Sequence, residues 1–410
     1  MKLTILSLSG MLLLATQVNA QQQPSVSVNV NPKVSTTVST SSSYSYTTND
    51  VKNNVNISYS SSSNSQDVQD DSPMKAKTFA KSFNLDRNDK INLSNQFGNM
   101  TIKTWDKNEI KVDVDIKAYA KTEEEAQKLL DDVSINATKS GDLVSYKTNI
   151  GERNGNWGKS VKNGKTIWRR EVKVNYTVYM PSVNSLTAAQ SYGNINIDDF
   201  SGPTSLKVQY GNLVAGDLSN ANNYVNVQYG KCSLKDVNKA NIKHQYGGGV
   251  TLTSINDLEL DAQYTSVNIG SVKNNANIKH QYGSGATIGY AGSLTVNMQY
   301  ANVKVDKLAG TFTGKFQYGK LDINNIEVGC KIFNVDGDYS TIAVGFAPSF
   351  NGEFSVNTNY GGFKYGSNVT AKKLGDDKSY SSSKSYSGQI GKGGSANVNV
   401  KTDYGSVTFK

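Results

Sequence analysis

Apolar and polar residues alternate along most of the chain, and from residue 186 onward the alternating pattern is itself repeated. Around Tyr210 the apolar positions have offsets of −4, −2, +3, +5 and +8, and the same offsets recur around Tyr229. Period-two spacing on both sides of a break predicts two strands joined at a corner, each with one face inward. The residues at these offsets are Leu206, Val208, Leu213, Ala215 and Leu218, then Val225, Val227, Cys232, Leu234 and Val237.

A tyrosine marks each repeat, mostly at steps of about 18 residues, which is typical of a solenoid. No proline lies between Pro203 and Pro348, as expected where each N–H joins a ladder to the next coil. We therefore predict an all-β fold, a parallel β-solenoid over 186–410 with an insertion at about 367–394, right-handed by the crossover rule. The marking tyrosines are Tyr192, Tyr210, Tyr229, Tyr246, Tyr264, Tyr282, Tyr300, Tyr318, Tyr339, Tyr360 and Tyr404.

The preceding region, 74–185, is also rich in period-two alternation, which predicts strands. Thr122 followed by Glu125 is a capping-box pattern, and it predicts one helix that begins there. The segment 96–102 carries one copy of the repeat pattern, centred on Phe97. We expect this region to join the same sheet and to cap the open end of the solenoid.

The first 73 residues carry the signals for export. Residues 1–20 combine a cationic start, a short apolar run and a small-residue exit, so they are predicted to be a signal peptide. Residues 21–73 are rich in Ser, Thr and Asn, and they predict a disordered stalk. No second apolar run is long enough to cross a bilayer, so we expect no transmembrane segment in the mature chain. The expected location is exported: cell surface, secreted or periplasmic.

Composition narrows the function classes further. The chain of 410 residues has only two His and two Cys, which argues against a zinc ribbon, an iron–sulfur cluster or a disulfide scaffold. Its net charge of +9 comes without a dense Lys/Arg cluster, so we expect no nucleic-acid partner. No phosphate loop, dinucleotide fingerprint or Ser-His-Asp arrangement occurs, and no cofactor is expected.

Three short motifs carry a resemblance to a known group. They are Gly98–Ile102 followed by Trp105-Asp106, then Gly193–Ile197, and finally Tyr404–Phe409. Together they resemble the bacterial putative-adhesin β-solenoid family, over about residues 79–410. The resemblance implies an exported domain of unknown biochemical function with an adhesin-like shape, and it supplies no catalytic residues.

One outward column is a candidate polymer-binding surface. Lys alternates in it with Asn or Asp, which removes repulsion between neighbouring like charges. It also sets the cations about two rungs, roughly 9.6 Å, apart, a spacing that an anionic glycan with regular charges could match. The column reads Lys207, Asn226, Lys243, Asp261, Lys279, Asn297 and Lys315, and its four lysines are the candidate site residues.

Two further columns flank each corner. The tyrosines share parity with Val208 and Val227, which predicts an inward, stacked core edge; the alternative is an aromatic sugar-binding strip. The glycine after several of the tyrosines (Gly211, Gly230, Gly283 and Gly319) suits a corner that needs positive φ or a close approach between coils. A glutamine precedes seven of the tyrosines; it faces outward and predicts an amide ladder, or alternatively contacts with a polysaccharide. These glutamines are Gln209, Gln228, Gln245, Gln263, Gln281, Gln299 and Gln317.

The remaining chemistry-bearing residues favour structural roles. His244 and His280 are predicted to point inward two rungs apart, too far to share a metal ion. Cys232 and Cys330 are expected to be buried free thiols, because about five rungs separate them. Asp199, Asp217 and Asp236 recur at one offset, which is a candidate for glycan cleavage, although Asp before a turn is a common structural choice.

These observations favour an exported, non-catalytic, adhesin-like solenoid that acts in surface adhesion or envelope binding through repetitive polar faces. A self-assembling, curli-like fibre subunit is the first alternative, because of the repeated Gln-Tyr-Gly elements. A polysaccharide-active β-helix enzyme is the second alternative.

Overall fold

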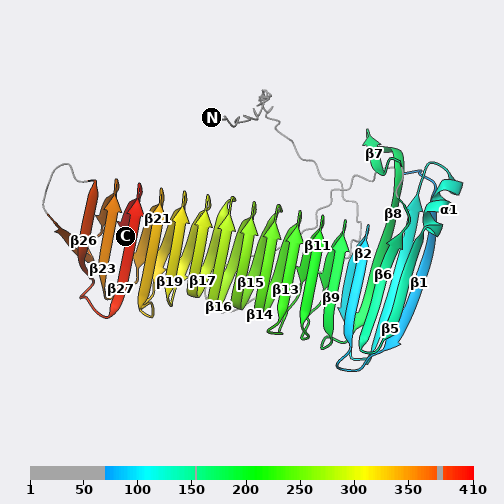
Figure 1. The fold of residues 1–410 in the computed structure, drawn as a ribbon, viewed down its shortest axis with the longest axis horizontal. Helices are drawn as coiled ribbons and strands as arrows, with labels where there is room; N and C mark the ends of the chain where they lie inside the picture. The colour runs from blue at the N-terminus through cyan, green and yellow to red at the C-terminus, as the bar shows by residue number, and fades with distance from the viewer. Residues whose placement is uncertain (1–69, 153–154, 376–381) are drawn as a thin grey trace, which may run out of the picture. The chain divides into compact units, whose positions relative to one another are not determined.

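The computed structural model describes residues 70–152, 155–375 and 382–410. The predicted signal peptide, 1–20, lies outside these residues, as does nearly all of the predicted stalk, 21–73. Within the described residues the chain forms one helix and a single open sheet of 28 strands (Figure 1), so the predicted all-β class is confirmed.

The region before the repeats contains the helix and the first eight strands. Thr122 caps the helix as predicted, because its Oγ1 accepts a hydrogen bond from the Glu125 N–H at 3.2 Å. Ala126, Leu129 and Leu130 form the buried side of the helix. The elements are β1 (Met74–Asn84), β2 (Lys90–Gln96), β3 (Met100–Thr104), β4 (Glu109–Tyr119), α1 (Glu123–Asp131), β5 (Val133–Ser140), β6 (Leu143–Ile150), β7 (Gly158–Lys162) and β8 (Lys165–Met180).

Each later repeat contributes two strand segments, which we call the first arm (before the repeat aromatic residue) and the second arm (after it). One repeat with its two arms is a rung. In the middle of the chain a single long strand contains the second arm of one rung and the first arm of the next. The strands are β9 (Ser185–Ser191), β10 (Ile195–Ile197), β11 (Thr204–Gln209), β12 (Leu213–Ala215), β13 (Asn223–Gln228), β14 (Lys231–Gln245), β15 (Gly249–Gln263), β16 (Ser266–Gln281), β17 (Gly285–Gln299), β18 (Val303–Leu308), β19 (Phe312–Gln317), β20 (Lys320–Ile326), β21 (Ile332–Asp338), β22 (Thr341–Phe346), β23 (Gly352–Asn359), β24 (Gly362–Tyr365), β25 (Val369–Leu374), β26 (Ser383–Ile390), β27 (Ala396–Asp403) and β28 (Ser406–Phe409).

Equivalent arms of neighbouring rungs pair in parallel, with matching repeat positions opposite each other. Val208 pairs with Val227, and Val227 pairs with His244. The first arms follow the order β2, β9, β11, β13, β14, β15, β16, β17, β19, β21, β27, β23. The second arms follow the order β3, β10, β12, β14, β15, β16, β17, β18, β20, β22, β28, β24. The copy of the repeat at 96–102 thus joins the same sheet, as expected.

At the C-terminal end the order of the rungs in space differs from their order along the chain. β27 lies between β21 and β23, and β28 lies between β22 and β24. Figure 1 shows β27 in red between β21 and β23. The last segment of the chain therefore fills an interior position of the sheet.

Antiparallel strands terminate the ladder of first arms at both ends. β5 pairs with β6 beyond β2, while β26 and β25 form an antiparallel pair beyond β23. This pair occupies most of the predicted insertion, 367–394; residues 376–381 within it lie outside the described residues. Beyond β3, β8, β4 and β1 extend the sheet, the last two by antiparallel pairing. Strands paired in this way cover edges that would otherwise recruit another chain.

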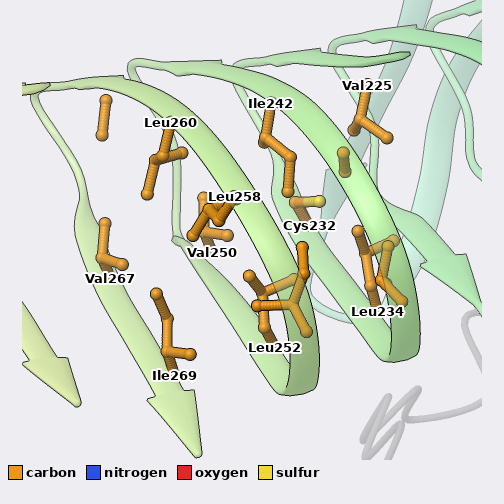
Figure 2. Close-up of a cluster of buried hydrophobic side chains, with 14 of the residues drawn as sticks. Val225, Cys232, Leu234, Ile242, Val250, Leu252, Leu258, Leu260, Val267 and Ile269 are labelled. Carbon is orange, nitrogen blue, oxygen red and sulfur yellow. The ribbon is translucent and has the colours of Figure 1, made fainter. Parts of the chain in front are cut away.

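The core lies between the two arms of the rungs. The inward residues alternate along both arms, and Figure 2 shows them filling the space enclosed by successive rungs. Val225, Leu234, Ile242, Leu252 and Ile269 each have at most 1% of their surface exposed. Because every rung adds the same set of apolar side chains, the core is continuous along the repeats and leaves the outward columns free to vary.

Candidate functional site

The repeat tyrosines lie on the outer surface, which corrects the inward orientation predicted from their parity with Val208. All eleven have φ between +49° and +56°, the left-handed region. Side chains alternate between faces only along extended backbone, so a left-handed residue at the corner breaks the alternation. The exposed fraction of these side chains runs from 41% at Tyr282 to 62% at Tyr360.

A glycine follows eight of the eleven tyrosines and serves the close approach of coils, whereas the positive φ is adopted by the tyrosine. Thr265, Ala301 and Ser340 hold this position on the other three rungs. A Cβ on Gly211 would lie 1.9 Å from the carbonyl oxygen of Gly193, and one on Gly230 would lie 1.7 Å from that of Gly211. The backbone hydrogen bonds nevertheless continue through the corner, since the Tyr210 N–H donates to the Gln228 carbonyl at 2.9 Å.

The exposed rings form one continuous column, which we call the tyrosine ladder; it comprises Phe97 and the eleven tyrosines. Neighbouring rings are stacked with centroids 4.7–5.3 Å apart and planes within 13° of parallel. The ladder crosses the reordered end without a break, because Tyr404 stacks on both Tyr339 and Tyr360. Stacking in this way covers the ring faces and leaves the ring edges and hydroxyl groups at the surface. Among the described residues, no hydroxyl of the ladder hydrogen-bonds to another protein group.

The left-handed corner is costly for a tyrosine. A non-glycine residue in this region costs about 1–2 kcal/mol. One aromatic pair returns about 0.5–1.5 kcal/mol. The stacking energy of the ladder therefore roughly offsets the backbone strain of its tyrosines, whereas glycine would adopt the same φ without strain. What tyrosine adds over glycine is a ring edge and a hydroxyl group at the surface.

The predicted glutamine ladder is present in part beside the tyrosine ladder, with side-chain hydrogen bonds in four of its six neighbouring pairs. The side-chain amide of one glutamine donates to the side-chain oxygen of the next at 3.0–3.1 Å in three pairs, and at 3.5 Å from Gln228 to Gln245. The three shorter pairs are Gln245 with Gln263, Gln281 with Gln299 and Gln299 with Gln317.

The lysine column has the register that the sequence predicts. Lys207, Asn226, Lys243, Asp261, Lys279, Asn297 and Lys315 lie opposite one another in succession. The sequence alone did not reveal that the alternation continues through the reordered rungs, from Lys315 to Asp336, Lys401 and Asn357. Lys401 is thus a fifth member, and only the register of β27 places it there. All five lysines are exposed, and none forms an ion pair with another described residue.

The two histidines and two cysteines are buried, as expected. His244 and His280 are fully buried with Ala262 between them in register, and burial lowers the pKa of both imidazoles. Burial also raises the pKa of the Cys232 thiol to about 12 and that of the Cys330 thiol to about 11. Both cysteines are free.

Two of the three aspartates near the turns, Asp199 and Asp217, make local side-chain contacts. Oδ1 of Asp199 accepts a hydrogen bond from the Asp217 N–H at 2.8 Å, and Oδ1 of Asp217 lies 3.1 Å from Nζ of Lys235. In the part of the chain that the structure describes, no group of three or more His, Cys, Asp or Glu side chains is arranged to hold a metal ion.

Comparison with known proteins found similarity only to solved structures. No protein-family model and no curated protein matches the chain. A "putative cell adhesion protein" from Clostridium sporogenes has 12% identity and a TM-score of 0.17, with 82% of this chain and 99% of that chain covered. A "putative lipid binding protein" from Parabacteroides distasonis has 11% identity and a TM-score of 0.30, covering 81% and 96%. A "putative adhesin" from Parabacteroides merdae has 11% identity and a TM-score of 0.25, covering 82% and 96%.

Within the described residues, no helix is both long and apolar enough to span a membrane.

Proposed function

We propose that this protein is an exported, non-catalytic, adhesin-like protein that binds an extended anionic polymer along the outer surface of its first arms. The observation that carries the proposal is the lysine column. Its alternation of cationic with neutral or acidic rungs continues through a C-terminal end where the order of the rungs is rearranged. A regular row of exposed cations without acidic partners is suited to a ligand that is itself long, regular and anionic.

The tyrosine ladder supports the same proposal. A buried aromatic side chain contributes about 150–250 Å², so the eleven tyrosines, which are 41–62% exposed, present on the order of 1,000 Å². The largest apolar patch of an ordinary monomer covers roughly 300–600 Å², and larger patches mark binding surfaces. The ladder runs parallel to the lysine column with the glutamine column between them, so the three columns form one elongated surface.

The proposal includes an architecture for display. We propose a right-handed solenoid with coils of about 18 residues, preceded by a capping region at 74–185, a stalk at 21–73 and a cleaved signal peptide at 1–20. Antiparallel strands at both ends of the first-arm ladder disfavour end-to-end addition of copies, which favours a binding protein over the alternative of a fibre subunit.

Replacement of the five lysines by asparagine tests the proposed binding surface. Asparagine already occupies alternate rungs of this column, so we expect the variant to fold. Retention on immobilised polygalacturonate and hyaluronan should fall by about tenfold or more at low salt, because exposed charge pairs are worth about 0.2–1 kcal/mol each and about 1.4 kcal/mol corresponds to tenfold. A control replaces five exposed lysines elsewhere, Lys231, Lys273, Lys304, Lys307 and Lys364, and it should retain binding. Equal losses in the two variants would show that net charge alone attracts the polymer.

Location is tested separately on intact cells. Added protease should cleave the 186–410 region in whole cells if the protein is displayed on the surface. Protection in whole cells with cleavage after lysis would place the protein in the periplasm and would refute adhesion at the cell surface, leaving binding within the envelope.

A further inference from the structure

The tyrosine ladder and the lysine column repeat with different periods along the same axis. An aromatic ring is present at every rung from Phe97 to Tyr360. A lysine is present at every second rung from Lys207 to Lys401. A ligand aligned with both columns would therefore meet two rings for each cation.

We propose that the ligand is an acidic polysaccharide of alternating sugars, with one anionic group on every second sugar. The inference rests on the proposed function and names the class of polymer that the same surface takes. One extended sugar unit advances a chain by roughly one rung of about 4.8 Å, so each sugar meets one ring and every second sugar meets one lysine.

The rungs between the lysines select against a polymer that is charged on every sugar. Asp261 lies between Lys243 and Lys279, and Asp336 lies between Lys315 and Lys401. An anionic group at those two rungs would face a carboxylate, and at the rungs of Asn226 and Asn297 it would face an uncharged amide. Specificity of this kind needs a repulsive element against the wrong ligand as well as attraction for the right one.

The ladder contacts the sugars through its edges. The parallel stacking within 13° leaves no room for a sugar to lie on an internal ring face. The phenol hydroxyls have no hydrogen-bond partner among the described residues, so they are left to exchange hydrogen bonds with sugar hydroxyls. Gln245 and Gln299 each use one amide hydrogen and the carbonyl oxygen within the glutamine ladder, which leaves their second amide hydrogen available.

A variant that removes only the hydroxyls isolates this contribution. Tyr246, Tyr264, Tyr282 and Tyr300 are changed together to phenylalanine. Phe97 already holds a left-handed position in the ladder, with φ of +60° and a ring stacked on Tyr192 at 4.9 Å, so the rings are expected to keep their stacking. The matched control changes Tyr290 and Tyr365, which are exposed but lie outside the ladder, to phenylalanine.

The experiment measures binding of the mature full chain to three soluble polymers by isothermal titration. They are hyaluronan, with a carboxylate on alternate sugars, polygalacturonate, with one on every sugar, and neutral dextran. We expect hyaluronan to bind most tightly, and the four-tyrosine variant to bind it about tenfold or more weakly than the control variant does. Changing Asp261→Asn and Asp336→Asn should narrow the preference for hyaluronan over polygalacturonate.

The outcomes separate the two proposals. If polygalacturonate binds as tightly as hyaluronan and both depend on the five lysines, the alternating-sugar inference is wrong while the proposed function stands. Unchanged hyaluronan binding by the four-tyrosine variant overturns the role of the ladder. If neither anionic polymer binds in a lysine-dependent way, the proposed function and the inference that rests on it both fail.

Discussion

Substitution of Gly230 by alanine is a stringent test of the corner geometry. The new Cβ would lie 1.7 Å from the carbonyl oxygen and 2.6 Å from the carbonyl carbon of Gly211. The neighbouring atoms are backbone in a ladder whose spacing is about 4.8 Å, so relief requires two rungs to separate. Overpacking of side chains typically costs about 1–3 kcal/mol. Thr265, Ala301 and Ser340 already carry a Cβ at the equivalent position of other rungs, so the corner can shift to admit one. We therefore expect a loss in the free energy of unfolding of about 1–3 kcal/mol.

Gly362 provides the matched control. An added Cβ there has no atom within 4 Å, and the residue does not adopt positive φ. Gly362→Ala should therefore leave stability unchanged or raise it by about 0.4–1 kcal/mol through a less flexible unfolded chain. Urea unfolding followed by circular dichroism measures both variants. Hydrogen exchange of amides near residues 211–230 detects local opening, because repeat arrays can lose stability in parts. A Gly230→Ala protein within 0.5 kcal/mol of the parent would refute the close approach of these coils.

Two further predictions concern the buried titratable groups. Burial lowers the pKa of His244 and His280 below the unfolded value of about 6.5, so their neutral forms stabilise the fold above that pH and the contribution is lost as the pH falls. Between about pH 7.5 and pH 5 the Tm of the parent should therefore fall more than the Tm of a His244→Met, His280→Met variant. Methionine is chosen because Met298 already holds this position on the rung that pairs with His280. Equal falls in Tm would contradict the prediction. Because the pKa values of Cys232 and Cys330 are raised, neither thiol should react with a thiol reagent at about pH 8 in the native protein. Both thiols should react in denaturant. Rapid labelling of the native protein would disprove their burial.

The sequence predicted the repeat well because period-two alternation reports directly on the face of an extended strand. The inward positions, the registers of the glutamine and lysine columns and the burial of both histidines followed from that single rule. The cap of the helix was equally local, since Thr122 and Glu125 are only three residues apart.

The same rule failed at the tyrosines because it assumes extended backbone. The alternation continued from Val208 predicts an inward side chain for Tyr210, but the left-handed φ of +56° at Tyr210 turns that side chain outward. A tyrosine is a poor candidate for a left-handed corner on intrinsic preference. The glycine beside it is the residue that adopts that conformation most easily. A signal was available in this position itself, because Thr265, Ala301 and Ser340 replace the glycine on three rungs, which shows that the position does not require positive φ.

The spatial order of the rungs at the C-terminal end could not be predicted from the sequence for a different reason. Repeats with nearly the same sequence can exchange places without any change in local pattern, so nothing in 396–410 distinguishes an interior rung from a terminal one. Lys401 was missed on this account, although its offset from Tyr404 matches that of Lys315 from Tyr318.

The rearranged order of the rungs at the C-terminal end also determines when this end of the sheet can fold during synthesis. Rungs that are ordered along the chain can be added one after another as the polypeptide emerges during synthesis. β23 and β24 have no lasting parallel neighbours until β27 and β28 arrive between them and the preceding rung, and those strands are synthesised after β23–β26. These rungs are therefore completed in one closing event that waits for residues 396–409, so a growing chain does not finish this part of the sheet until β28 has been made.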